Sequence, residues 1–313
     1  MRTSDTYRRS PPSSLRHAWA SDAAAPYLAI GAAFAWLSLG VAAQTPDWRL
    51  DDLLARVGER IEQYFTRAQR IVFVEKTTIQ YIGANLTPFG FARVVESEVR
   101  VESNPADGDA DGSAETNVLR ELRKINGRTR RTNNDPNNCL DPNPVSPEPL
   151  AFLLPARRGD YEFMWVGYGK GKDHSRAMID FREIGSGKPE VKERTDRGEG
   201  CFSIDLPGRA RGRVWIDAST YEVVRVDQRI TGFVDFRLPD PKSRRSGLDD
   251  RGVLERFDIS IRYKTVPFRD PEEIVLVPES IDTLMVVRGM QSYRMKQVFS
   301  EYRRFVTGAK LVK

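Results

Sequence analysis

Histidine, the side chain most often used in acid–base catalysis, is scarce in this 313-residue chain. The chain contains two histidines. His17 lies near the N-terminus, which leaves His174, in a charged turn beside Lys172 and Asp173. A Ser/His/Asp or Cys/His arrangement, or a multi-histidine metal site, would depend on this one residue. The pattern therefore favours a solvated surface histidine and a protein that is not an enzyme.

Two short motifs resemble ligand sites, but each lacks a part. Asp107, Asp109 and Asp111 reproduce the first half of a calcium-binding loop, whose twelfth position is Val118 here in place of Glu. An acidic solvated loop and a weak calcium site both remain open. The glycine-rich run 167–172 resembles a phosphate cradle but lacks the earlier Gly and the following Ser or Thr of a P-loop. We interpret it as a flexible turn.

Carboxylates are numerous, but no two of them stand out as an acid and a base. The chain carries 44 Asp and Glu residues. The separation of two carboxyl groups in space decides whether they can act together, and the sequence does not give that separation. A carboxylate-based hydrolase therefore remains an alternative. No motif for a cofactor is found, and we expect neither a cofactor nor a resident metal.

Aromatic residues are the best candidates for contact with an apolar ligand. For each of them, packing in the core is the competing interpretation. If the protein forms a half-open sheet, some of these rings must line its hollow side. The candidate ligand-binding residues are Tyr64, Phe163, Trp165, Trp215 and Phe233.

An uncharged apolar run at 26–43 indicates export. It ends in Val41, Ala42 and Ala43, which is typical of the cleavage site of a secretory leader. We therefore expect residues 1–43 to be a signal peptide with a polar extension, and residues 44–313 to form a single domain. The expected location is the periplasm or the extracellular space. Because such a run could also span a bilayer, an uncleaved N-terminal anchor is the alternative.

Charge and cysteine content agree with an exported protein. Beyond residue 43 the chain carries 45 Lys or Arg and 42 Asp or Glu residues, so its net charge is small. No basic stripe with interleaved aromatic residues is found, and we expect no binding to nucleic acid. Cys139 and Cys201 both lie in the exported part, where thiols usually pair. We predict a disulfide between them, with two unpaired thiols as the alternative.

The periodicity of apolar residues predicts one helix followed by many strands. Apolar side chains recur every three or four residues over 46–69, which predicts an amphipathic helix. A short helix is expected at 149–157, and polar loops at 104–117, 133–149 and 239–252. Asn126 and Gly127 predict a tight hairpin. Strands are predicted at 71–82, 91–102, 118–125, 128–132, 161–168, 177–184, 201–206, 213–217, 222–230, 257–263, 281–287 and 293–302.

The expected fold is mainly β (α+β), a large curved antiparallel sheet in meander order. A sheet of this size must curl, which gives a half-barrel with the long N-terminal helix against its concave face. The segment 212–232 resembles the lipoprotein-localisation carrier family. The matching pattern is a strand that contains Trp215 and Asp217, a polar turn, and a second strand that ends in Gly232. The order of elements over 46–305 is also similar to uncharacterised secreted bacterial proteins of that type. The resemblance implies an open hydrophobic cavity, although long loops and the cysteine pair depart from it.

Together these observations predict a monomeric, extracytoplasmic protein that binds without doing chemistry. The expected ligand is a lipid or a lipidated chain such as a lipoprotein, held between the concave sheet and the helix at 48–69. Transfer of apolar surface would supply the affinity, at roughly 25 cal/mol per Å² buried. The alternative is an envelope sensor or protein-interaction domain on the same fold, whose loops at 104–117 and 239–252 contact a protein partner.

Overall fold

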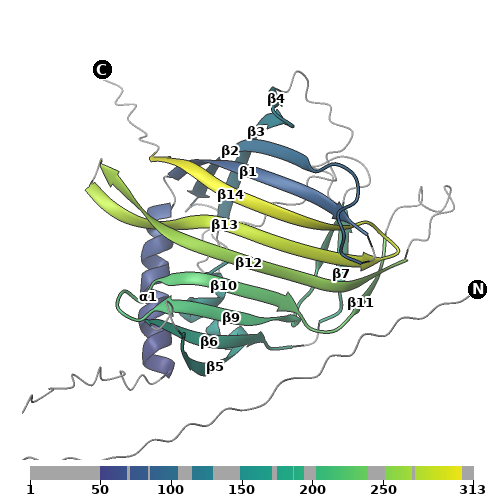
Figure 1. Cartoon of the computed structure of the whole chain (residues 1–313). Coiled ribbons are helices and arrows are strands. Elements are labelled where there is room, and N and C mark those ends of the chain that lie inside the picture. Colours follow the sequence, from purple (N-terminus) through teal and green to yellow (C-terminus); the bar gives the residue numbers. More distant parts are fainter. Residues whose placement is uncertain are drawn as a thin grey trace, which may run out of the picture. The chain divides into compact units, whose positions relative to one another are not determined.

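Strands make up most of the described part of the chain (Figure 1). The computed structural model describes residues 50–68, 71–83, 85–104, 115–129, 149–170, 175–185, 187–193, 202–238, 251–269 and 272–304. The helices are α1 (Leu50–Ala68) and the 3₁₀ helices η3 (Ala151–Leu153) and η4 (Pro155–Asp160). The first strands are β1 (Ile71–Ile82), β2 (Arg93–Asn104), β3 (Glu115–Ile125), β4 (Arg128–Thr129), β5 (Tyr161–Tyr168), β6 (Arg176–Glu183) and β7 (Glu190–Glu193). The others are β8 (Phe202–Asp205), β9 (Ala210–Asp217), β10 (Val223–Ile230), β11 (Val234–Arg237), β12 (Arg251–Arg269), β13 (Glu272–Arg288) and β14 (Ser292–Arg304).

Twelve of these strands form one open antiparallel sheet. Its order is β4-β3-β2-β1-β14-β13-β12-β10-β9-β6-β5, and β11 also pairs with β12. The short strands β7 and β8 form a separate hairpin. The edges β4 and β5 do not pair with each other, so the sheet is not closed into a barrel. The predicted fold class, a large open antiparallel sheet with one long helix and a short helical segment, is confirmed.

The strand order differs from the predicted meander in two ways. β8, predicted as a strand at 201–206, pairs with β7 outside the main sheet, so β6 pairs with β9. The other difference is the pairing of β1 with β14. β1 and β14 pair along almost their whole length, so the first and last strands of the chain meet in the interior of the sheet. Glu75 on β1, only 1 % exposed, lies beside this junction. Its carboxylate accepts hydrogen bonds from Gln297 Nε2 of β14 at 2.7 Å, from Arg120 Nε of β3 at 2.8 Å and from Thr77 Oγ1 at 2.8 Å. This pairing joins residues far apart in the sequence, which strand periodicity does not encode.

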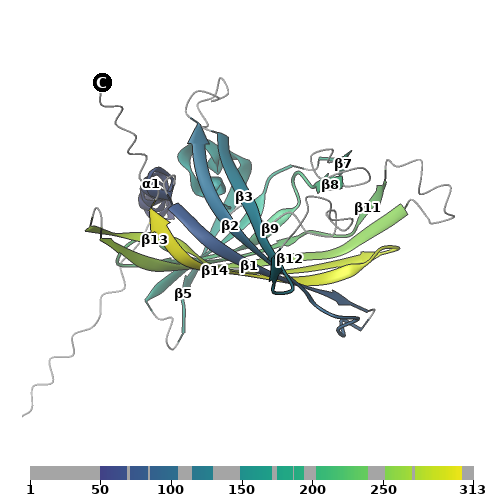
Figure 2. The ribbon, with the colours of Figure 1, turned by 90° about the horizontal axis from the view of Figure 1, so that it is seen from above.

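The two faces of the sheet differ in what covers them. Side chains alternate between the faces along a strand. On β9, for example, Val214 and Ile216 are buried against the helices, whereas Arg213 and Trp215 face the other way. We name the side that carries α1 the helix face and the opposite side the open face. Figure 2 shows α1 and the β7–β8 hairpin on the same side of the strongly twisted sheet.

α1 is amphipathic because its apolar residues recur at helical spacing. Five side chains on one stripe are 5 % exposed or less: Leu53, Leu54, Val57, Ile61 and Tyr64. They join the side chains of η3 and of the helix face in one hydrophobic core. The predicted helix at 46–69 is therefore confirmed for its described residues, 50–68.

Local turn chemistry was also predicted well. Asn126 and Gly127 connect β3 to β4 with φ of 49° and 78°, the positive values that a type I′ hairpin turn requires. The short helix expected at 149–157 is present as the two 3₁₀ helices η3 and η4.

The long strands near the C-terminus extend further than predicted. β12 covers Arg251–Arg269 and β13 covers Glu272–Arg288, in place of 257–263 and 281–287. Both strands continue through a proline, Pro267 in one and Pro278 in the other. Strands β7 and β11 were not predicted. β2 reaches Asn104 and β3 begins at Glu115, so both strands include residues at the ends of the loop predicted at 104–117.

Replacement of Leu53 by Ala should lower the free energy of unfolding by about 2–5 kcal/mol, because it removes a fully buried side chain between α1 and the sheet. Glu59→Ala, on the exposed side of the same helix, should change it by less than about 0.5 kcal/mol. Urea unfolding of both variants measures the difference. Equal losses in the two variants would contradict the packing of this stripe.

Candidate ligand-binding site

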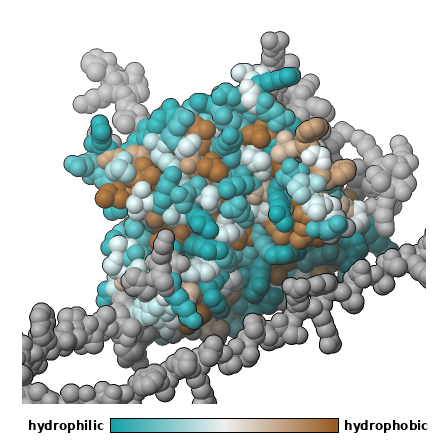
Figure 3. Space-filling model, viewed as in Figure 1, coloured by the Kyte–Doolittle hydropathy of each residue, from teal (hydrophilic) through white to brown (hydrophobic). Residues whose placement is uncertain are grey.

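A large cavity lies on the open face. Its volume is about 1080 Å³, and residues of β1, β6, β9, β10, β12, β13 and β14 line it. Seven Lys or Arg and four Asp side chains are among them, so cations are in excess. Trp215 and Leu284 add half-buried apolar surface. Figure 3 shows this face, where hydrophilic side chains predominate and hydrophobic residues form smaller patches between them.

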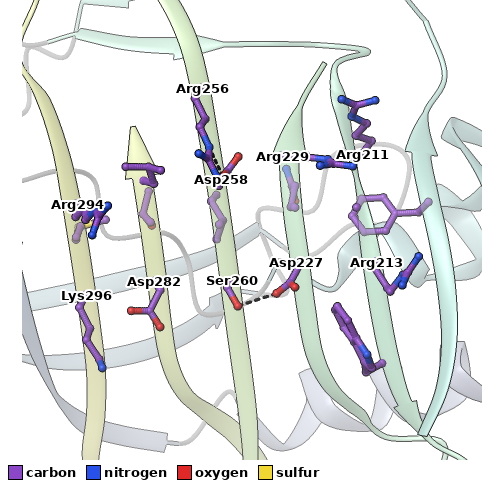
Figure 4. Close-up of a pocket in the computed structure, with 18 of the residues that line it drawn as sticks. Arg211, Arg213, Asp227, Arg229, Arg256, Asp258, Ser260, Asp282, Arg294 and Lys296 are labelled. Atoms are coloured by element: carbon purple, nitrogen blue, oxygen red, sulfur yellow. Dashed lines mark hydrogen bonds and ion pairs between the residues drawn. The ribbon is translucent and has the colours of Figure 1, made fainter. Parts of the chain in front are cut away.

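One cross-strand row of the cavity is held together by ion pairs. Asp180, Arg213, Asp227 and Ser260 are direct neighbours on four adjacent strands. Arg213 donates to both oxygens of Asp180, at 2.5 and 2.9 Å. Asp227 accepts two hydrogen bonds from Arg225, at 2.8 and 2.7 Å. Figure 4 shows the hydrogen bond that it accepts from Ser260 Oγ, at 2.7 Å. The hydrogen bond with Asp180 raises the pKa of Arg213, so this row keeps its charges paired.

The next row, two residues along each strand, is different. Arg182 of β6 lies directly opposite Arg211 of β9, and Arg211 lies directly opposite Arg229 of β10. Three arginines thus occupy consecutive positions across the sheet, and all three are exposed. Like charges placed directly opposite each other destabilise a sheet. Figure 4 shows Arg211 and Arg229 extended over neighbouring strands on the open face.

The acidic residues near this row bind other cations. Arg182 donates to Glu162 Oε2 at 2.6 Å. Asp258 is the cross-strand neighbour of Arg229, but Arg256 donates to its carboxylate at 2.5 Å. Arg211 and Arg229 therefore have no ion-pair partner among the described residues. The sheet holds two adjacent positive charges at the surface of the cavity.

Three of the five predicted ligand-binding residues lie on the helix face. Tyr64 is 5 % exposed and its ring contacts Tyr263 edge-on at a centroid distance of 6.4 Å. Phe163 stacks on Phe152 at 6.3 Å. Trp165 packs against the same hydrophobic core. These rings fill the space between the helices and the sheet.

The other two predicted residues lie elsewhere. Trp215 lines the open-face cavity, with the guanidinium of Arg225 at 4.6 Å from its ring centroid. Phe233 is 68 % exposed, in the connection between β10 and β11. The structure therefore does not bring the five aromatic residues together in one site.

The region between α1 and the sheet has little free space. The cavity described there, lined by Tyr64, Leu150 and Val223 among others, has a volume of only about 20 Å³, which is room for one water molecule. A ligand was expected in this region, because the sequence pattern placed the hollow side of the sheet under the helix. The large cavity lies on the opposite face, since α1 and η3 occupy the helix side.

Several sequence-based predictions lie outside the described residues. Within the described part of the chain, no three His, Cys, Asp or Glu side chains are grouped so as to hold a metal ion. No helix of that part is long and apolar enough to cross a membrane. The predictions that fall outside are the leader at 1–43, the acidic loop with Asp107, Asp109 and Asp111, the pair Cys139 and Cys201, and His174.

The arginine row was missed at the level of sequence. Arg182, Arg211 and Arg229 belong to three separate strands, and each resembles an ordinary solvated residue there. Arg211 and Arg213 alternate with the buried Val214 and Ile216, which identified β9 as a half-exposed strand but not its register. Only the pairing of β6 with β9 and of β9 with β10 aligns the three guanidinium groups.

Comparison with known proteins assigns neither a family nor a function. No family model matches the chain, and no curated protein matches it. It is similar to the crystal structure of a DUF1329 family protein from Desulfovibrio piger, with 11 % identity and a TM-score of 0.33. The similarity covers 84 % of this chain and 94 % of that chain. The resemblance to the lipoprotein-localisation carriers therefore remains an expectation from the sequence.

Replacement of Arg211 by Gln should stabilise the ligand-free protein by about 0.5 kcal/mol at low salt, because it removes a like-charge contact on either side. Added salt should shrink the gain, since these side chains are exposed and screened. Arg213→Gln, two residues along the same strand, removes a paired cation and should destabilise the protein. Thermal unfolding of both variants is the measurement. A loss of stability in both would contradict the unfavourable arginine row.

Proposed function

We propose that this protein is a non-catalytic binding protein of the cell envelope, and that it holds a lipid or lipidated chain in the open-face cavity. The observation that carries the proposal is the difference between the open-face cavity, of about 1080 Å³, and the space under α1, of about 20 Å³. A further cavity of about 840 Å³ lies beside Val191 of β7, away from α1. The larger volume is of the size that encloses small-molecule ligands.

The lining of the cavity favours an amphiphile over a bare acyl chain. Phe181, Ile259 and Met295 lie at its floor, but each is 8 % exposed or less. Trp215 and Leu284 offer the accessible apolar surface, and charged side chains surround them. A ligand that satisfies both kinds of surface has an apolar part and a polar head.

The state of the carboxylates supports binding without catalysis. Asp180, Asp227 and Asp258 each accept hydrogen bonds from an arginine. Arginine donors thus occupy oxygens of all three carboxylates, which leaves these oxygens less available to a substrate. Asp282 is the fourth carboxylate of the cavity and lies directly opposite Lys296. We therefore propose no reaction at this site.

Native mass spectrometry of the full-length protein extracted from envelope membranes should detect a copurified lipid. Leu284→Asn should reduce the bound fraction several-fold, because it removes apolar surface inside the cavity. Met164→Asn is the matched control: Met164 is 61 % exposed on β5 and lies outside the cavity lining. Repeated isolation of the wild-type protein without lipid would overturn the proposal.

One observation favours the second candidate function, a protein-interaction domain. Three connections that expose large apolar side chains lie at the same end of the sheet. They lie together because β1, β10 and β13 all end there. Phe91 is 100 % exposed, Phe89 66 % and Phe233 68 %, and Met290 is 40 % exposed in the turn between β13 and β14. Gln80 fixes the first connection by donating to the carbonyl oxygens of Phe89 and Gly90.

A photo-crosslinker at position 91 tests this candidate. If the apolar tips contact a protein, crosslinking in the envelope should give one discrete adduct, and Phe89→Ser should reduce its yield several-fold. The same crosslinker at Met164, on the edge strand β5, should give none. A diffuse set of weak adducts at both positions would count against a dedicated partner.

A further inference from the structure

The positive charges of Arg211 and Arg229 require an explanation that the fold does not supply. The two residues are direct cross-strand neighbours, both are exposed, and both line the open-face cavity. Neither has an ion-pair partner among the described residues, and Asp258, directly opposite Arg229, accepts its hydrogen bond from Arg256. A local arrangement that lowers stability, with no compensating interaction in the fold, is typical of a functional site.

We propose that Arg211 and Arg229 form a binding site for a phosphate group of the ligand. This inference rests on the proposed function, because that function places the ligand in the open-face cavity. Residues directly opposite each other in an antiparallel pair have Cα atoms roughly 4.5–5.5 Å apart. Two guanidinium groups at this spacing can donate to one small anion from the same side. Arginine presents a planar fork of donors that matches phosphate and carboxylate oxygens.

Charge and oxygen count select phosphate over carboxylate. A phosphate monoester carries a charge of about −1.5 to −2 near neutral pH and three terminal oxygens. It can therefore neutralise both arginines and accept hydrogen bonds from both. A carboxylate carries one charge and two oxygens, which a single arginine already satisfies. Arg182 stands next in the row and adds positive potential, although Glu162 accepts its hydrogen bond.

The surroundings of the two arginines suit a phosphate that carries an apolar chain. Along the same row, Asp258 of β12 and then Leu284 of β13 follow Arg229. Two strand spacings separate Leu284 from Arg229, roughly 10 Å. An alkyl chain that leaves a phosphate at Arg211 and Arg229 can reach Leu284 across the cavity floor. Free phosphate compounds share the same head chemistry and are distinguished by the experiment.

Isothermal titration calorimetry of the full-length protein tests the site with three probes. Dodecyl phosphate carries a head and a chain, 1-lauroylglycerol a chain with a neutral head, and inorganic pyrophosphate a head alone. The amphiphiles are used below their critical micelle concentrations. Dodecyl phosphate should bind at least about tenfold more tightly than 1-lauroylglycerol, because only the phosphate forms charge-assisted hydrogen bonds.

The double variant Arg211→Gln/Arg229→Gln isolates the contribution of the two arginines. It should lose at least about tenfold in affinity for dodecyl phosphate and keep its affinity for 1-lauroylglycerol. The matched control is Arg262→Gln/Lys76→Gln, which removes two exposed cations from the open face outside the cavity lining. The control should bind dodecyl phosphate like the wild type. Thermal unfolding of each variant confirms that it is folded.

The outcomes separate this inference from the function on which it rests. Equal affinity for both amphiphiles, unchanged in the double variant, would overturn the phosphate site and leave lipid binding in place. Binding of pyrophosphate without either amphiphile, lost in the double variant, would support the phosphate site and overturn the lipid ligand. An equal loss in the control variant would overturn the site as well, because the effect would then reflect net charge. Absence of binding for all three probes would overturn both.

Discussion

The pairing of β1 with β14 is the contact on which the rest of the structure depends, because it joins the two ends of the described chain within one sheet. Glu75 fixes this pairing from the helix face. A buried carboxylate is costly unless its oxygens are satisfied, and Glu75 obtains its donors from Arg120, Gln297 and Thr77. Those donors come from β3, β14 and β1, so the carboxylate specifies the register of three strands. A slip of one residue would exchange the two faces of a strand.

Which side chains point to each face of the sheet determines where space for a ligand remains. Once the register is set, strands such as β9 present apolar side chains to the helix face and polar side chains to the open face. Under α1 and η3 the helix face is a filled core, in which rings such as Phe152 and Phe163 stack on one another. Helices cover only one side of this wide sheet. On the other side, the twist of the sheet and its long polar side chains determine the shape of the surface. The open-face cavity is the result, and its chemistry is that of paired and unpaired charges.

Local features of this fold could be predicted from sequence, whereas features that depend on strand pairing could not. The stripe of α1, the Asn126–Gly127 turn and most strands follow from spacing and residue type within short windows. Trp215 and Trp165 look alike in such windows, yet one faces the cavity and the other the core. Irregularities in pairing, such as those at Trp165 in β5 and before Arg225 in β10, change which residues share a face. The arginine row depends on two strand registers, that of β6 with β9 and that of β9 with β10, so no single segment contains a signal for it.

The arginine row is tolerated because its cost is small beside the packing that surrounds it. Removal of one buried leucine from a core of this kind costs about 2–5 kcal/mol, whereas a like-charge contact between exposed side chains costs at most about 1 kcal/mol. A ligand present at ten times its dissociation constant stabilises the folded state by about 1.4 kcal/mol, which exceeds that cost. Arg211 and Arg229 would then act against the fold only when the cavity is empty. The fold accepts a small local destabilisation, and the same two charges become favourable when an anion lies between them.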